Sequence, residues 1–130
     1  MMEIEATTII FLLVIHFLAD FALQTHEQAS NKSTSNKWLF YHVGTYSLIW
    51  LLAMYSYIDI FSEALIFACI TFVFHFATDY ITSRLAKKFF DVKDYHNGFV
   101  VVGFDQLLHI IQLVYTYIIL ENVYWLDRLF

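Results

Sequence analysis

The chain has 130 residues, of which 60% are hydrophobic, 20% aromatic and only 15% charged, and its formal net charge is −5. Its mean hydropathy of +0.62 excludes an ordinary soluble domain, which at this size cannot bury so much apolar surface, and also excludes a disordered chain. The negative charge argues against a nucleic-acid partner. From the high hydropathy, we predict a single-domain integral membrane protein whose main partner is the lipid bilayer.

Four stretches are long and apolar enough to be transmembrane helices, since a bilayer core takes about 20 mainly apolar residues per helix. In chain order they cover residues 6–24, 38–57, 60–85 and 98–120. None of them alternates between polar and apolar residues as a strand would, and a membrane barrel needs more strands than this chain supplies. We therefore predict an all-α polytopic fold in which the whole chain forms one bundle of four transmembrane helices.

Three polar segments separate these stretches. The first, THEQASNKSTSNK, is rich in Ser and Asn, and the second, SYIDIFSE, is a short acidic turn. The third, RLAKKFFDVKDYHNG, is charged, and we expect its first part to continue the preceding helix as an amphipathic extension.

The charged residues predict the orientation, because cytoplasmic loops are enriched in Lys and Arg. Six of the seven basic residues fall in the first and third segments, on one side of the membrane: Lys32, Lys37, Arg84, Lys87, Lys88 and Lys93. Acidic residues of the termini and the second segment fall on the other side: Glu3, Glu5, Asp59, Glu63, Glu121 and Asp127. We predict an inner-membrane protein with both termini on the non-cytoplasmic side, and Arg128 is the single exception to this pattern.

Two of the apolar stretches carry the same polar motif. The sequences HFLADFALQ and HFATDYITS both begin with His-Phe, have Asp at the fifth place and end on a polar residue four further on. Residues four apart share one face of a helix, so each motif predicts a polar stripe. The stripes are His16, Asp20 and Gln24 on the first helix, and His75, Asp79 and Ser83 on the third. The repeat suggests two helical hairpins related by duplication.

The second and fourth stretches add polar residues at a matching depth. The second contains His42 and Tyr46, and the fourth contains the motif DQLLH, with Asp105, Gln106 and His109. The first and third helices run toward the cytoplasm and the other two run away from it. At about 1.5 Å of rise per residue, all these groups fall in the cytoplasmic half of the bilayer, so we predict one shared site.

The predicted site contains four imidazoles and three carboxylates: His16, Asp20, His42, His75, Asp79, Asp105 and His109. These groups are typical ligands of a divalent metal ion, zinc first, with manganese and iron as alternatives. Seven groups suit either two ions that share a carboxylate, or one ion whose His ligands are oriented by second-shell Asp residues. An Asp residue in lipid costs about 2.5–3.5 kcal/mol on insertion scales, so a functional site is preferred over simple interhelical hydrogen bonds.

Three classes of function are compatible with such a site. The first is a metal-dependent hydrolase that acts on a lipid or another membrane-associated substrate, with Asp79 or Asp105 as the general base. The other two are a proton or metal-ion transporter, and a non-catalytic membrane partner protein. The outer halves of the helices, such as TTIIFLLVI and LVYTYIIL, carry no charge, which favours an enzyme or a ligand-binding pocket, open to one side, over a conduit. A homo-oligomer could still form a path between subunits.

Further polar residues are expected close to the metal ligands: Gln24, Lys32, Tyr46 and Gln106. Lys32 suits a phosphate group of a lipid substrate, although charge-directed topology explains a basic residue there equally well. Gln106 and Tyr46 suit hydrogen bonds either to a substrate or to a neighbouring helix.

The polar motifs resemble those of a family of small bacterial and phage membrane proteins catalogued as domain of unknown function 3307. The resemblance rests on HFLADFALQ, on Asn31-Lys32, on FYHV, on HFATD and on DQLLH, which occur in this order over nearly the whole chain. The family motif positions fall on His16, Asp20, Gln24, Lys32, His42, His75, Asp79, Asp105, Gln106 and His109. The resemblance implies a helical membrane fold and this choice of polar residues, and it brings no activity with it.

Overall fold

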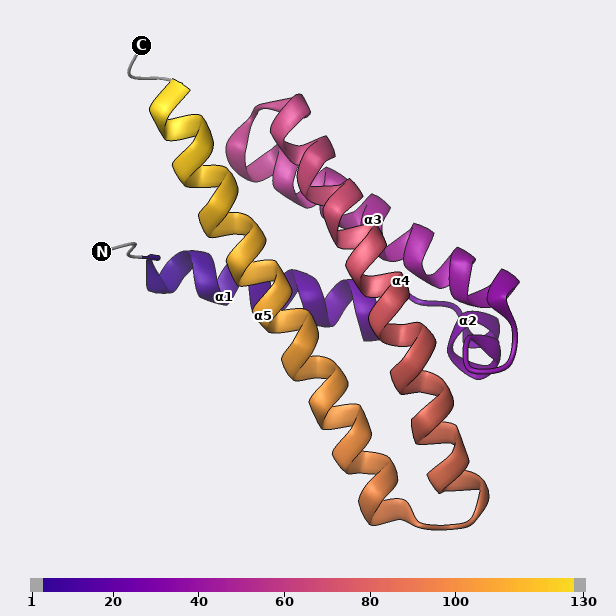
Figure 1. The fold of residues 1–130 in the computed structure, drawn as a ribbon. Helices are drawn as coiled ribbons and strands as arrows, with labels where there is room; N and C mark the ends of the chain where they lie inside the picture. Colours follow the sequence, from indigo (N-terminus) through magenta and orange to yellow (C-terminus); the bar gives the residue numbers. More distant parts are fainter. Residues whose placement is uncertain (1–3, 128–130) are drawn as a thin grey trace.

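A computed structural model describes residues 4–127 and has an all-α fold (Figure 1). The chain forms α1 (Ala6–Phe17), the π-helical turn η1 (Leu18–Ala22), α2 (His26–Asn31), α3 (Asn36–Ile58), α4 (Phe61–Asp91) and α5 (Tyr95–Asp127). The all-α prediction is confirmed, and the four predicted stretches fall mainly on helix. The first stretch ends earlier than predicted, because the helix stops at Ala22 and Gln24 lies after it, outside the predicted helical stripe. Glu3 and Arg128, which contribute to the predicted charge pattern, lie outside the described residues, as does the side chain of Asp127.

Local sequence signals explain where the helices begin and end. A capping box starts α2, in which the Thr25 hydroxyl accepts from the backbone N–H of Gln28 and the Gln28 side chain accepts from that of Thr25. The Asp59 backbone, with φ of 56°, ends α3 in the left-handed conformation, which Asp tolerates better than most residues. No Gly or Pro interrupts α4, so it continues past residue 85 to Asp91, and the predicted extension is confirmed.

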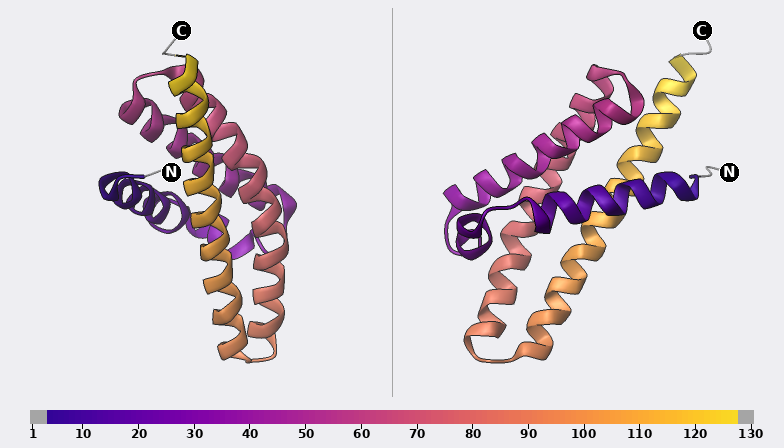
Figure 2. Two further views of the ribbon diagram at one scale, coloured as in Figure 1. Left: turned by 60° about the vertical axis from the view of Figure 1, so that its left-hand side comes forward. Right: turned by 180° about the vertical axis from the view of Figure 1, so that it is seen from behind.

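The helices are packed unequally. The long helix α4 packs along both α3 and α5, whereas α1 and η1 contact α3 and α5 over a shorter stretch. Figures 1 and 2 show α1 crossing the other long helices obliquely. The two halves of the chain that carry the repeated motif are therefore packed differently, and the duplication stays a prediction.

An apolar core fills the bundle on one side of the polar residues. Its largest fully buried members are Trp50, Tyr46, Phe67, Leu12 and Leu113. On α1, Leu12 precedes His16, and on α5, Leu113 follows His109, so on both helices the apolar residue lies nearer the end of the bundle that carries the chain termini. The polar residues therefore lie between this core and the opposite end of the bundle.

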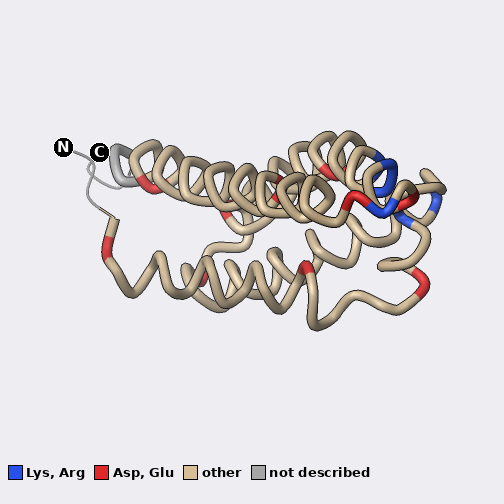
Figure 3. Tube along the Cα trace, turned by 90° about the horizontal axis from the view of Figure 1, so that it is seen from below, with Lys and Arg blue, Asp and Glu red and all other residues tan. Residues whose placement is uncertain are grey.

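The charge distribution along the bundle agrees with the predicted asymmetry. Figure 3 shows the described Lys and Arg residues gathered at one end, with the two chain termini at the other. By length and composition, α4 and α5 (over Tyr95–Tyr124) are able to cross a membrane, and Ala6–Ala22 is apolar but shorter. Large apolar side chains such as Val73, Ile81 and Phe99 are about two-thirds exposed on the outside of the bundle, which is typical of a surface that meets lipid or a partner.

Candidate metal site

The structure brings the predicted His and Asp residues together at the centre of the bundle. They come from α1, η1, α3, α4 and α5, and each is at least nine-tenths buried. The prediction that these side chains converge is confirmed. We call this group the His/Asp cluster; it consists of His16, Asp20, His42, His75, Asp79, Asp105 and His109.

Asp20 enters the cluster from the π-helical turn η1. The Leu23 N–H donates to the Leu18 carbonyl at 2.8 Å, five residues back instead of four. Such single π turns are rare and often occur at functional sites. The expected pair of His16 Nε2 and Asp20 Oδ2 is long, at 3.9 Å, whereas Asp20 Oδ1 lies 3.1 Å from His42 Nε2 on another helix. Asp20 therefore lies closer to His42 on α3 than to His16 on its own helical stripe.

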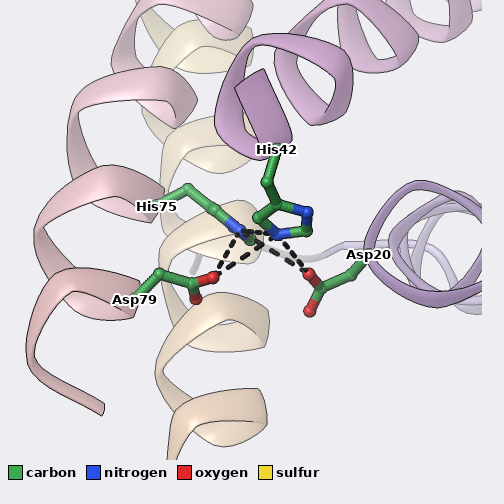
Figure 4. A group of neighbouring side chains, drawn as sticks. All are labelled: Asp20, His42, His75 and Asp79. Carbon is green, nitrogen blue, oxygen red and sulfur yellow. Dashed lines mark hydrogen bonds and ion pairs between the residues drawn. The ribbon is translucent and has the colours of Figure 1, made fainter. Parts of the chain in front are cut away.

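Four side chains surround one point in the cluster: Asp20, His42, His75 and Asp79 (Figure 4). The two Nε2 atoms of His42 and His75 are 3.1 Å apart. Asp20 Oδ1 lies 3.1 Å and 3.6 Å from these two nitrogens, and Asp79 Oδ2 lies 3.4 Å and 3.5 Å from them. Ligands placed about 2.1 Å from a tetrahedral ion are about 3.4 Å from one another. The spacing therefore fits one divalent ion, and we call these four residues the His42/His75 site.

Stacking holds the imidazole of His75 in place. Its ring lies 3.9 Å from the ring of Tyr46 and 4.1 Å from that of His109, measured between centroids.

The Nδ1 atoms of His42 and His75 have no hydrogen-bond partner among the described residues, and neither does Asp20 Oδ1. Buried polar atoms are usually paired, so an unpaired carboxylate oxygen that faces two imidazole nitrogens is consistent with a place for a cation.

Lys32 reaches into the His42/His75 site from the end of α2. Its Nζ lies 2.8 Å from Asp79 Oδ2, 3.3 Å from His42 Nε2 and 4.0 Å from Asp20 Oδ1. Burial by itself lowers the pKa of Lys32, but the carboxylates of Asp79 and Asp20 outweigh it, so the pKa is raised. The side chain is therefore an ammonium group, and it lies against the same oxygens that would ligate a metal ion.

His16 has a different place from the other three histidines. With the Gln106 amide as it is oriented here, His16 Nε2 donates to Gln106 Oε1 at 2.7 Å. The neutral ring then accepts at Nδ1 from the Tyr46 hydroxyl, 2.8 Å away. Gln106 Nε2 in turn donates to Asp20 Oδ2 and to Asp105 Oδ2, each at 3.0 Å. Both ring nitrogens of His16 are thus engaged, and its role as a metal ligand stays a prediction.

A cavity of about 200 Å³ lies beside the cluster. Polar side chains line much of its wall: Asp20, Gln24, Lys32, Asp79, Thr82, Ser83, Asp105 and Gln106. Of the four further residues predicted close to the site, Gln24, Lys32 and Gln106 line this cavity, whereas Tyr46 contacts His16 and His75. The Gln24 Oε1 and Ser83 Oγ atoms are buried without a hydrogen-bond partner in the described chain. The cavity therefore offers free polar groups to a ligand next to the His42/His75 site.

Thr82 is a member of the site that the sequence pattern did not identify. Its hydroxyl contacts Asp105 Oδ1, and its side chain lines the cavity. Thr82 lies seven residues after His75 and three after Asp79, which places it on the same face of α4. This spacing was the available signal, but a Thr residue in an apolar helix carries no charge and is common there.

Comparison with known protein families places the chain in a family. The sequence model of a family described as "Protein of unknown function (DUF3307)" matches residues 8–127. This range contains the whole His/Asp cluster and Lys32. No curated protein and no solved structure matches the chain.

Proposed function

The chain belongs to the DUF3307 family, and we propose that it is a four-span membrane protein that binds a divalent metal ion and hydrolyses a phosphate-bearing lipid or another membrane-associated substrate. One observation carries the proposal: four buried ligand atoms at the His42/His75 site lie within 4.8 Å of one another, and the distances that involve the two imidazoles are close to those between the ligands of a tetrahedral ion. Zinc is our first candidate for an all-nitrogen and oxygen site of this kind, and manganese and iron follow.

The helices support a four-span arrangement. At about 1.5 Å per residue, the 23 residues of α3 reach across a hydrocarbon core of about 30 Å. The segment Ala6–Ala22 is shorter and ends close to the cavity and the cluster, where polar groups replace lipid. The gathering of Lys and Arg at one end supports the proposal that this end faces the cytoplasm.

Labelling of single cysteines tests this topology. In a Cys69→Ser background, we expect Asp59→Cys to react with a membrane-impermeant maleimide in intact spheroplasts, because the turn before α4 faces outward. Lys37→Cys, at the start of α3, is expected to react only after the membrane is permeabilised. Equal labelling of both positions in intact spheroplasts would contradict the four-span topology.

The arrangement favours hydrolysis over transport. The cavity beside the cluster shares no lining residue with a second cavity, which lies toward the other end of the bundle and is lined by Phe67, Glu63 and Glu121. The side chains of Trp50, Phe67 and Leu113 on that side of the cluster are fully buried. A transport path needs access to its site from both sides of the membrane. A substrate that enters the cavity meets Lys32, whose ammonium group suits a phosphoryl oxygen.

Two carboxylates were predicted as the general base, and their surroundings differ. Asp79 has both oxygens engaged, Oδ2 with Lys32 at 2.8 Å and Oδ1 with His109 at 3.0 Å. Both residues line the cavity, and the two oxygens of Asp105 are held by Thr82 and Gln106. With one ion bound at the His42/His75 site, Asp79 would be a ligand of that ion, which leaves Asp105 to take a proton from an attacking water. The ion itself would lower the pKa of that water and polarise the scissile group.

Hydrolysis of a fluorogenic phosphate ester by the purified protein tests the function. We expect the rate to fall at least about a hundredfold when the metal is removed with a chelator, and to return with zinc or manganese, because a bound ion supplies the nucleophile. Asp59→Asn changes a carboxylate far from the cluster and is expected to behave as the wild-type protein does. A rate that is unchanged by chelation would contradict a metal-dependent reaction.

A further inference from the structure

We propose that the His/Asp cluster holds two divalent ions, the second between Asp105 and His109, with the carboxylates of Asp20 and Asp79 shared between both ions. This inference rests on the proposed function, because it adds an ion to the one at the His42/His75 site. It also names the substrate class that such a pair of ions selects.

Asp79 presents its two oxygens to two different groups of histidines. Its Oδ2 lies 3.4 Å from His42 Nε2 and 3.5 Å from His75 Nε2. Its Oδ1 lies 3.0 Å from His109 Nε2, on the other side of the carboxylate. A carboxylate that bridges two ions about 3.5–4 Å apart places one oxygen on each of them. Asp79 has this orientation.

The two oxygens of Asp20 also face different groups. Its Oδ1 lies 3.1 Å from His42 Nε2, whereas its Oδ2 accepts from Gln106 Nε2 at 3.0 Å, beside Asp105. Asp20, Asp105 and His109 each offer one ligand atom, and these three atoms lie within 4.8 Å of one another. The second oxygen of Asp79 thus faces His109, and the second oxygen of Asp20 lies on the side of Gln106 and Asp105.

At the second position, two contacts of His109 have lengths that suit the ligands of one ion. His109 Nε2 lies 3.4 Å from Asp105 Oδ2 and 3.0 Å from Asp79 Oδ1, close to the separation of about 3.4 Å between the ligands of a tetrahedral ion. His109 is only 1% exposed. We call Asp20, Asp79, Asp105 and His109 the His109 site.

An N–H group lies at each of the two positions in this structure. The ammonium group of Lys32 contacts Asp79 and Asp20 at the His42/His75 site. The amide nitrogen of Gln106 donates to Asp20 Oδ2 and Asp105 Oδ2 at the His109 site, each at 3.0 Å. Each pair of carboxylates is therefore held together by a hydrogen-bond donor, and a divalent ion can replace either donor between the same oxygens.

The charge of the cluster indicates what the pair of ions would bind. Its three carboxylates face the single ammonium group of Lys32, which leaves two negative charges when the histidines are neutral. One divalent ion cancels this excess, and the second makes the site doubly positive. A phosphoryl dianion in the adjoining cavity then restores neutrality, so the two-ion site selects phosphate monoesters over uncharged esters. With two ions, Asp105 acts as a ligand and no separate base is required.

Manganese binding to the full-length protein in detergent tests the second ion. We expect two equivalents of Mn²⁺ by metal analysis, and an exchange-coupled electron paramagnetic resonance spectrum, because the two ions share carboxylates. Asp105→Asn and His109→Gln are each expected to retain one equivalent and to give the uncoupled six-line spectrum of an isolated Mn²⁺ ion. Gln112→Leu, which changes a residue bonded to Thr71 and Thr116, is expected to retain both ions.

The outcomes separate the two proposals. One equivalent and an uncoupled spectrum in the wild-type protein would overturn the second ion and leave the His42/His75 site standing. No bound manganese, zinc or iron in the wild-type protein would overturn both proposals. Should Asp105→Asn fail to fold, the wild-type spectrum and His109→Gln still decide the question.

Discussion

Asp79→Asn is expected to abolish high-affinity metal binding, with a loss of at least about a hundredfold in affinity, because it removes the carboxylate that contacts three of the four histidines of the cluster. Loss of a residue that merely orients a metal ligand already costs about 10–100-fold. The carboxylate of Asp79 contacts Lys32, His42, His75 and His109 within 3.5 Å. Isothermal titration with Zn²⁺ measures the affinity directly.

The same substitution is expected to lower the stability of the metal-free protein by about 3 kcal/mol, since it leaves Lys32 without its closest partner in a buried setting. Thermal unfolding with and without zinc separates the two effects. The wild-type protein gains about 2.7 kcal/mol at a zinc concentration of 100 times the dissociation constant, whereas the variant gains nothing. Asp59→Asn is the matched control, because Asp59 is exposed and Asn also tolerates its left-handed backbone. A variant that binds zinc as the wild-type protein does would show that Asp79 is not a ligand.

Lys32→Met is expected to move metal affinity and hydrolysis in opposite directions. Removal of the ammonium group 2.8 Å from Asp79 Oδ2 takes away a cation that competes for the same oxygen. We expect the affinity for Zn²⁺ to rise roughly tenfold, which corresponds to about 1.4 kcal/mol. The rate of phosphate-ester hydrolysis is expected to fall about a hundredfold, because the charged group that meets the substrate is lost.

Lys37→Met is the control for this experiment, since Lys37 is exposed and lies against Tyr41 instead of the cluster. It is expected to leave both quantities unchanged. A parallel fall of metal affinity and rate in Lys32→Met would contradict the competition between Lys32 and the metal. Lys32 would then act as a structural residue that holds the loop after α2 against the bundle.

Much of the site could be predicted from helix geometry alone. The i, i+4 spacing placed His75 and Asp79 on one face of α4, and both occur in the His42/His75 site. Comparison of depths along four helices of predicted direction added His42 and Asp105. These inferences succeed because helix rise and periodicity are fixed by the backbone, so residue positions convert into positions in space.

Other features depend on how the helices pack, and spacing does not reveal them. The π-helical turn η1 turns Asp20 toward His42, and no residue in its sequence, LADFA, marks such a turn. The oblique path of α1 was unexpected for a bundle of four parallel and antiparallel helices (Figure 2). The contact between Lys32 and Asp79 could not be predicted from spacing, because a long side chain from a loop has no periodicity.

The metal content of the wild-type protein, purified in detergent without chelators and measured by mass spectrometry, tests the central claim most directly. The geometry of the His/Asp cluster predicts at least one equivalent of zinc, manganese or iron per chain. Protein that is folded and contains no metal, and that takes up none of these ions on reconstitution, would contradict the claim. The buried His and Asp residues would then be held together by Lys32, Gln106 and their own hydrogen bonds.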